Sequence, residues 1–278
     1  MKSILVTGAS TGIGEACALR LADSGHRVFA GVRKESDAIR LRNKGAAHLV
    51  PVFLDVTEHD QVDALAEQIA KEAGSLDGVV NNAGVARGGP IEYLPDDVWR
   101  DQFEVNVLGQ VAVTRAMLPL IREGKGRIVF IGSIGGKVAT MMMGPYNASK
   151  FAIEAIGESL RHELHPWDIG VSVVEPGAIK TEIWDKGRET ADRLERELPP
   201  EASSRYARHI AAIRKGIDMQ DRQGIGPGKV AEAVEHALFD PRPKTRYVVG
   251  VDARVQSLLV RLLPDRSREW IIRRVAGP

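Results

Sequence analysis

The sequence predicts a single α/β domain, in which a doubly wound parallel sheet of about seven strands carries helices on both faces, as in a Rossmann fold. Two observations support this fold class. Short β-branched segments alternate with longer amphipathic segments along most of the chain. The strand-like segments also lack polar alternation, which is typical of strands buried on both faces. The length of 278 residues suits one large domain of this kind.

Each predicted strand is a short apolar run, and a helical pattern follows most of them. Strands are predicted at 4–6, 28–32, 48–54, 78–80, 127–131, 171–174 and 246–250. Helices are predicted at 13–24, 58–73, 96–122 and 147–165, where apolar residues recur with helical spacing. The tract 182–226 is rich in Arg, Glu, Pro and Gly and interrupts the alternation. We interpret it as helices with a mobile substrate-loop insertion, and 253–278 as a C-terminal amphipathic extension.

The composition excludes several classes of protein. With 38 Lys and Arg against 37 Asp and Glu, the formal net charge is +1, so the basic excess expected of a nucleic-acid-binding protein is missing. Cys17 is the only cysteine, which excludes an internal disulfide. No apolar run of about 18 residues predicts a transmembrane helix, and the first strand follows the N-terminus without room for a signal peptide. We therefore expect a cytoplasmic protein.

A glycine-rich turn connects the first predicted strand to the first helix. Its spacing is Gly-x3-Gly-x-Gly, which differs from the commonest dinucleotide fingerprint, Gly-x-Gly-x-x-Gly. Glycines allow the backbone to approach a pyrophosphate, whose charge then lies at a helix N-terminus. A turn that needs glycine only for positive φ is the alternative. The residues expected to bind a dinucleotide here are Gly8, Ser10, Thr11, Gly12, Ile13 and Gly14.

The end of the second strand indicates which dinucleotide binds. It reads Val32-Arg33-Lys34, and the first acidic residue, Glu35, comes later. A guanidinium group pairs with a 2′-phosphate, whereas a carboxylate at this place accepts hydrogen bonds from an unmodified ribose. We therefore predict NADP(H) as the cofactor, with Arg33 contacting the phosphate and NAD(H) as the alternative. Solvated surface cations are the other interpretation of Arg33 and Lys34.

Tyr146 and Lys150 are four residues apart, so on a helix they share one face. A nearby ammonium stabilises a phenolate and lowers the pKa of a tyrosine, which makes Tyr146 a candidate general acid or base. Ser133 follows the fifth predicted strand and precedes this pair. A surface pair for Tyr146 and Lys150 and a helix cap for Ser133 are the alternatives.

In their order and approximate spacing, these motifs resemble those of the short-chain dehydrogenases/reductases with an extended catalytic tetrad. The resemblance covers residues 3–181 motif by motif and the rest more loosely. It is carried by the turn at 7–14, Asp55-Val56, Asn81-Asn82-Ala83-Gly84, Asn106, Ser133, Tyr146, Lys150 and Pro176-Gly177. Within the family, the chain looks nearest to the steroid and retinol dehydrogenase branch.

The resemblance implies a catalytic tetrad and the remainder of a cofactor site. Tyr146 would exchange a proton with the substrate oxygen, and Ser133 would hydrogen-bond to that oxygen where charge develops. Lys150 would bind the nicotinamide ribose and lower the pKa of Tyr146, while Asn106 would hold a water that links Lys150 to solvent. The other implied cofactor contacts are Asp55 and Val56 at the adenine, Asn82, Ala83 and Gly84 in the cleft, and Pro176, Gly177, Ile179 and Thr181 at the nicotinamide.

Apolar residues before Tyr146 and after Pro176 predict an apolar substrate pocket. The candidates are Ile134, Val138, Met141, Met142, Met143, Ile183 and Trp184. Consecutive methionines form an adaptable apolar wall. Core or interface packing is the alternative. The pocket would accept a bulky apolar ketone or secondary alcohol that is steroid-, retinoid- or lipid-like.

The function predicted from the sequence is an NADP(H)-dependent oxidoreductase for such a substrate. The alternatives are an NAD-dependent alcohol dehydrogenase of the same fold, a non-catalytic dinucleotide-sensing protein and a membrane-peripheral structural protein. The histidines have no partners at metal-ligand spacing, so no metal site is predicted.

The C-terminal extension combines apolar runs with arginines. A basic amphipathic helix of this kind can lie on an anionic membrane, but Pro264 interrupts it. We therefore favour docking on the domain or on a second subunit over membrane association. The long helices at 96–122 and 147–165 are the surfaces on which the family usually assembles, so a homodimer or homotetramer is expected.

Overall fold

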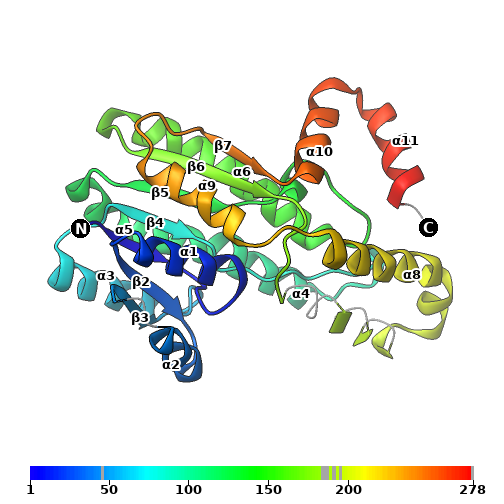
Figure 1. Ribbon diagram of the computed structural model, residues 1–278. Coiled ribbons are helices and arrows are strands. Elements are labelled where there is room, and N and C mark those ends of the chain that lie inside the picture. The colour runs from blue at the N-terminus through cyan, green and yellow to red at the C-terminus, as the bar shows by residue number, and fades with distance from the viewer. Residues whose placement is uncertain (45–46, 183–187, 190–191, 194–195, 277–278) are drawn as a thin grey trace.

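Seven parallel strands form one sheet in the computed structural model, which describes residues 1–44, 47–182, 188–189, 192–193 and 196–276. The strand order is β3-β2-β1-β4-β5-β6-β7 (Figure 1). The strands are β1 (Ser3–Val6), β2 (Arg27–Val32), β3 (Leu49–Phe53), β4 (Gly78–Asn81), β5 (Arg127–Ile131), β6 (Gly170–Pro176) and β7 (Arg246–Val249). The order reverses between β1 and β4, and ligands of such sheets bind at the carboxyl ends of the strands near this reversal. The predicted doubly wound parallel sheet is confirmed.

Helices cover both faces of the sheet. The helices of one face are α1 (Gly12–Asp23), α2 (Glu35–Asn43) and α9 (Gly228–Phe239), and those of the other are α3 (His59–Ala73), α5 (Gly109–Gly124) and α6 (Gly144–Leu164). Successive residues of β2 point to opposite faces, so Val28 and Ala30 pack with the first set and Phe29 with the second. Burial on both faces explains why the strands show no polar alternation. Helices α2 and α9 were not predicted from the sequence.

The predicted helix at 96–122 is a helical segment that contains a π turn. It consists of α4 (Asp96–Phe103), the π turn at Glu104–Leu108 and α5. Within it, the amide of Gly109 donates to the carbonyl of Glu104, five residues back. Such turns are rare and frequently occur at functional sites. Asn106, a predicted tetrad residue, lies in this one.

Helix α6 begins three residues before its predicted start. Pro145 lies in its first turn, where a proline costs no helical hydrogen bond. Tyr146 therefore belongs to the helix. The short 3₁₀ turns of the structure are Ile91–Tyr93, Ile134–Gly136 and His165–Trp167.

The C-terminal third adds α8 (Pro200–Gln223), α10 (Val251–Leu262) and α11 (Asp265–Ala276), which lie at the opposite end of the molecule from the N-terminus (Figure 1). Helix α8 lies within the tract 182–226, which we interpreted from the sequence as helices with a substrate-loop insertion. Pro264 separates α10 from α11, as predicted. No helix among the described residues is sufficiently long and apolar to span a membrane.

The C-terminal extension leaves much of its apolar surface uncovered. Ala253 is the buried residue of α10, whereas Leu258, Leu262 and Trp270 are more than half exposed. Docking of this face on the chain's own domain is thus not observed. Docking on a second subunit stays a prediction.

Candidate active site

The glycine turn has a backbone conformation and a close packing that exclude side chains at its glycines. Gly8 and Gly12 have φ values of +62° and +60°, a region that favours glycine. A methyl group on Gly14 would lie 2.2 Å from the carbonyl oxygen of Gly8, so the helix approaches the turn too closely for any side chain. Thr11, the N-cap of α1, makes no side-chain cap hydrogen bond. The first amides of α1 therefore remain available to an anion.

Asn82 holds the glycine turn against the end of β4. Its side-chain amide donates to the carbonyls of Thr7 at 2.9 Å and Gly8 at 3.0 Å. In return, the Thr7 hydroxyl accepts the backbone amides of Asn82 and Ala83, each at 2.9 Å. The carboxyl ends of β1 and β4 are thus joined at the reversal point of the sheet. Gly84, the last residue of this motif, is exposed beside Asn106.

Arg33 extends into solvent beyond β2. Its side chain is 66% exposed, and it lies 3.5 Å from the carboxylate of Asp55, beyond β3. Partial burial acts to raise the pKa of Asp55, but hydrogen bonds from Thr57 and the charge of Arg33 outweigh it and leave that pKa below its usual value. Both side chains contribute to a groove of about 660 Å³ beside α3. Val56 is buried against Gly109 at the start of α5.

Ser133 and Tyr146 meet across the 3₁₀ turn that follows β5. The Ser133 hydroxyl accepts the backbone amide of Gly135 at 3.0 Å and also hydrogen-bonds to the Tyr146 hydroxyl. A methyl group on Gly135 would come within 3.3 Å of the Tyr146 ring, so the turn packs directly on the tyrosine. These are the two groups expected to contact the substrate oxygen.

Lys150 lies below this pair and is 5% exposed. Its ammonium donates to the carbonyl of Ile131 at 2.7 Å and lies 5.8 Å from the centroid of the Tyr146 ring. Burial lowers the pKa of Lys150 to about 8. Burial also raises the pKa of Tyr146, and the hydrogen bond with Ser133 opposes that change. The expected lowering of the Tyr146 pKa by Lys150 is not seen, because the buried phenolate loses its hydration and the ammonium is directed to Ile131.

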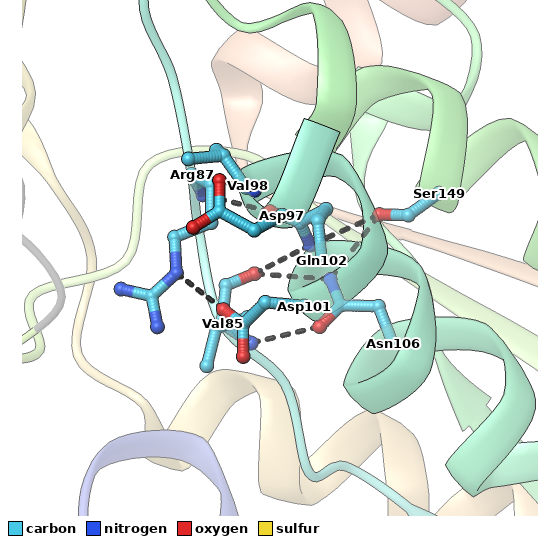
Figure 2. A network of polar contacts seen from close by, with 8 residues as sticks. All are labelled: Val85, Arg87, Asp97, Val98, Asp101, Gln102, Asn106 and Ser149. Atoms are coloured by element: carbon cyan, nitrogen blue, oxygen red, sulfur yellow. Dashed lines mark hydrogen bonds and ion pairs between the residues drawn. The ribbon is translucent and has the colours of Figure 1, made fainter. Parts of the chain in front are cut away.

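Asn106 connects the loop after β4 to helix α6 (Figure 2). Its carbonyl oxygen accepts the amide of Val85 at 2.8 Å. Its amide nitrogen donates to the carbonyl of Val85 at 3.0 Å and to the Ser149 hydroxyl at 3.2 Å. The side chain therefore binds protein groups at both ends, and it fixes the loop against α6.

Gln102 makes a second set of such contacts one turn earlier and was not singled out from the sequence. It is fully buried, accepts the amide of Arg87 at 2.7 Å and donates to the carbonyl of Val85 at 2.9 Å and to Ser149 at 3.3 Å (Figure 2). Ser149 donates in turn to the carbonyl of Tyr146 at 2.7 Å. Gln102 lies four residues before Asn106, so the two share one face of an amphipathic helix. This spacing could have identified Gln102 from the sequence.

The residues predicted to line a substrate pocket differ in their exposure. Ile134, Val138 and Met142 are buried, each with less than a tenth of its surface exposed. Met142 has a φ of +64° and its carbonyl accepts the amide of Gly89 at 2.6 Å. Of the three methionines, Met141 and Met143 retain intermediate exposure. Ile183 and Trp184 lie outside the described residues.

The segment after β6 closes the opposite side of the site. Pro176 ends β6, and the Gly177 amide donates to the carbonyl of Val249 at 2.9 Å. Ile179 is buried and pairs with Ile225 as an isolated parallel bridge. Thr181 lies against the glycine turn, where its methyl group is 3.1 Å from the position of a Cβ on Gly12. The turn and the predicted nicotinamide end are thus adjacent.

Comparison with known proteins finds similar chains over nearly the whole length. The family model described as short chain dehydrogenase matches residues 2–192. The NADPH-dependent 3-dehydrocapnine reductase of Ornithobacterium rhinotracheale is 36% identical over 278 residues, which cover 98% of this chain and 96% of that protein. The 17-beta-hydroxysteroid dehydrogenase type 6 of Bos taurus is 34% identical over 280 residues, covering 98% and 88% of the two chains.

A solved structure shares the whole fold. The short chain dehydrogenase from Burkholderia cenocepacia in complex with NADP superimposes with a TM-score of 0.74 at 27% identity. The match covers 100% of this chain and 98% of that one. The similarity therefore includes the C-terminal third as well as the glycine turn and the tyrosine helix.

Proposed function

This chain belongs to the short-chain dehydrogenase/reductase family, and from that membership we propose that it reduces a bulky apolar ketone with NADPH, or oxidises the corresponding secondary alcohol with NADP⁺. The observation that carries the proposal is the hydrogen-bonded pair of Ser133 and Tyr146 above the buried Lys150. The pair lies at the same sheet edge as a helix N-terminus with free amides.

The choice of NADP(H) rests on Arg33. Its ion pair with Asp55 is exposed, and such pairs contribute about 0–1 kcal/mol. A 2′-phosphate carries more charge than one carboxylate and offers bidentate acceptors, so it would displace Asp55. The relative named as NADPH-dependent and the structural neighbour in complex with NADP support this choice. NAD(H) is the alternative, with Asp55 as the group that would disfavour a phosphate.

The chemistry assigned to the site is a proton transfer coupled to a hydride transfer. When bound, the nicotinamide supplies the hydride to the carbonyl carbon. The Tyr146 hydroxyl donates its proton to the carbonyl oxygen, and Ser133 hydrogen-bonds to that oxygen as it becomes negative. Lys150, whose ammonium lies 5.8 Å from the centroid of the Tyr146 ring, would then return a proton to the phenolate from solvent. The water relay through Asn106 is part of this proposal, alongside its contacts to Val85 and Ser149.

A bulky apolar substrate is supported by two observations. Met141 and Met143, which come five and three residues before Tyr146 in the chain, keep exposed surface, and thioethers adapt to apolar ligands. The two relatives are named for a 3-dehydro compound and for a hydroxysteroid. A steroid ketone and a long-chain 3-ketone are therefore the first compounds to assay, with a small polar ketone as the negative control.

We further propose a cytoplasmic homodimer or homotetramer. Leu108 beside α5 and Phe151 on α6 are 51% and 44% exposed, on the helices expected to form the subunit contact. Light scattering should give the mass of two or four chains for the wild type and a smaller mass for Phe151→Glu. A wild-type monomer would contradict the proposed assembly.

Titration of the purified protein with NADPH and NADH, followed by fluorescence, tests the cofactor assignment. The wild type should bind NADPH at least about tenfold more tightly, since a hydrogen bond to a charged group contributes about 1.5–3 kcal/mol. Arg33→Asp should remove or invert this preference. Arg42→Asp, an equal charge change on α2, is the matched control and should keep it. Binding of NADH alone by the wild type would move the assignment to an NAD-dependent dehydrogenase, and binding of neither would favour a non-catalytic protein.

A further inference from the structure

Asp252 joins the C-terminal helices to the proposed nicotinamide end of the site. It is the second residue of α10, just beyond β7, and its side chain is exposed at the carboxyl edge of the sheet. Its carboxylate accepts the backbone amide of Ala178 at 2.7 Å. The two residues are 74 positions apart in the chain. The contact therefore ties the loop after β6 to the loop after β7.

The loop at 177–181 receives its backbone partners from the C-terminal third. Ala178 donates its amide to Asp252, and its carbonyl accepts the amide of Ile225 at 3.1 Å. Lys180 donates to the carbonyl of Ile225 at 2.9 Å, and Gly177 donates to Val249 at 2.9 Å. Among these partners, Asp252 is the one that acts through a side chain. It is therefore the one that a substitution can remove without changing the backbone.

The same carboxylate lies close against Gly177. A methyl group on Gly177 would lie 2.2 Å from Asp252 Oδ2 and 2.4 Å from Oδ1. A methyl group on Gly250 would lie 2.5 Å from Oδ1. The φ of Gly177 is not in the left-handed region, so a side chain at this position would disturb the close approach of Asp252 rather than the backbone conformation of residue 177.

We infer that Asp252 is a positioning residue for the cofactor, which sets the loop at 177–181 against the nicotinamide by holding the Ala178 amide and filling the space beside Gly177. This inference rests on the proposed function, because it takes that loop to be the nicotinamide end of the site. In the proposed site the adenosine half of the cofactor would lie at Arg33 and Asp55, which follow β2 and β3, whereas Asp252 follows β7 at the other end of the strand order. Loss of Asp252 should therefore weaken NADPH binding and spare the binding of its adenosine half.

The first test compares NADPH with 2′,5′-ADP, which carries only the adenosine half. Asp252→Ala should weaken NADPH binding about tenfold, the effect of one hydrogen bond to a charged acceptor, and leave 2′,5′-ADP binding unchanged. Asp252→Asn keeps an acceptor oxygen and should restore most of the affinity. Asp265→Ala removes an exposed aspartate from the first turn of α11 and is the matched control.

The second test is a double-mutant cycle between Gly177 and Asp252, read by thermal unfolding without cofactor. Gly177→Ala should destabilise the wild type clearly and the Asp252→Ala background much less, because the second change removes the clashing carboxylate. An equal loss in both backgrounds would overturn the inference.

The binding test separates this inference from the proposed function. Unchanged NADPH affinity in Asp252→Ala, or an equal loss for NADPH and 2′,5′-ADP, would overturn the positioning role while the wild type still binds NADPH. A wild type that binds neither compound would instead overturn the proposed function, and the positioning role with it.

Discussion

The region from β1 to α6 holds its polar side chains in hydrogen bonds to the backbone, whereas the region after β6 leaves large apolar side chains exposed. In the first region, Asn82, Gln102 and Lys150 all donate to backbone carbonyls, and the last two are buried. In the second region, α10 buries Ala253 but leaves Leu258 exposed. The polar side chains of the proposed site are thus held by hydrogen bonds within the chain. The apolar surface of α10 stays exposed in the single chain.

This difference has a physical reason. Proton and hydride transfer require groups placed within a fraction of an ångström, and buried hydrogen bonds supply that placement at low dielectric. A surface that binds different apolar partners needs exposed area more than fixed polar geometry. Substitutions in the first region should therefore have large effects and equivalent substitutions in the second region small ones.

The largest effect is expected at Tyr146. Tyr146→Phe removes the proton donor while keeping the ring, so turnover of the ketone should fall about 10²- to 10⁴-fold with NADPH affinity retained. Tyr247→Phe is the matched control, because its hydroxyl bonds to His236 and the Lys244 amide near the start of β7, away from the site. Steady-state rates and a cofactor titration measure both quantities. Unchanged turnover in Tyr146→Phe would exclude the assigned role.

Lys150 should make the stability of the protein depend on pH. Its pKa falls from 10.5 to about 8 on folding, so between these values the unfolded chain binds more protons at this site. The free energy of unfolding of the wild type, relative to Lys150→Met, should therefore rise with pH from about 8 to about 10.5, by at most about 3 kcal/mol. Urea unfolding at pH 7.5 and 9.5 measures this difference.

The exposed Lys71 provides the comparison for Lys150. Its side chain is 79% exposed on α3, so Lys71→Met should give an unfolding free energy that follows the wild type across the same pH range. A constant difference between the wild type and Lys150→Met would show that burial does not perturb this ammonium.

Replacement of two helical glycines by alanine should change the free energy of unfolding in opposite directions. Gly14→Ala places a methyl group against Gly8 and Asn82 and should destabilise the protein by about 1–3 kcal/mol or more. Gly216 in α8 has nothing within 4 Å of its missing Cβ, so Gly216→Ala should stabilise by about 0.5–1 kcal/mol through helix propensity. Denaturant midpoints test both. Destabilisation by Gly216→Ala would mean that α8 is more tightly packed than its exposure indicates.

The smallest effect is expected on α10. Leu258 is 56% exposed, so Leu258→Ala should change the free energy of unfolding by less than about 0.5 kcal/mol. Leu65 on α3 is 3% exposed, and Leu65→Ala should cost about 2–5 kcal/mol. A large loss in Leu258→Ala would indicate that α10 is covered in solution, and the oligomeric mass of that variant would show whether a second subunit covers it.

Much of the fold and site could be predicted because their signals are local. The strands appear as apolar runs, the turn at 7–14 as a glycine spacing, and the pair of Tyr146 and Lys150 as two residues one helical turn apart. The structure brings Ser133, Tyr146 and Lys150 together as expected. Helix α9 was not predicted, although it too carries a local signal, since its buried Val230, Val234 and Ala237 recur at helical spacing.

What the sequence by itself determined is the parallel sheet, the position of the glycine turn and the identity of the tyrosine helix, because burial periodicity and backbone geometry are properties of neighbouring residues. The tertiary structure alone decided the π turn at Asn106, the contacts of Gln102 with Ser149, the burial of Met142 and the bond between Asp252 and Ala178. Each of these depends on which distant segments meet at the carboxyl edge of the sheet. That meeting is set by the packing of the whole chain and not by any one segment.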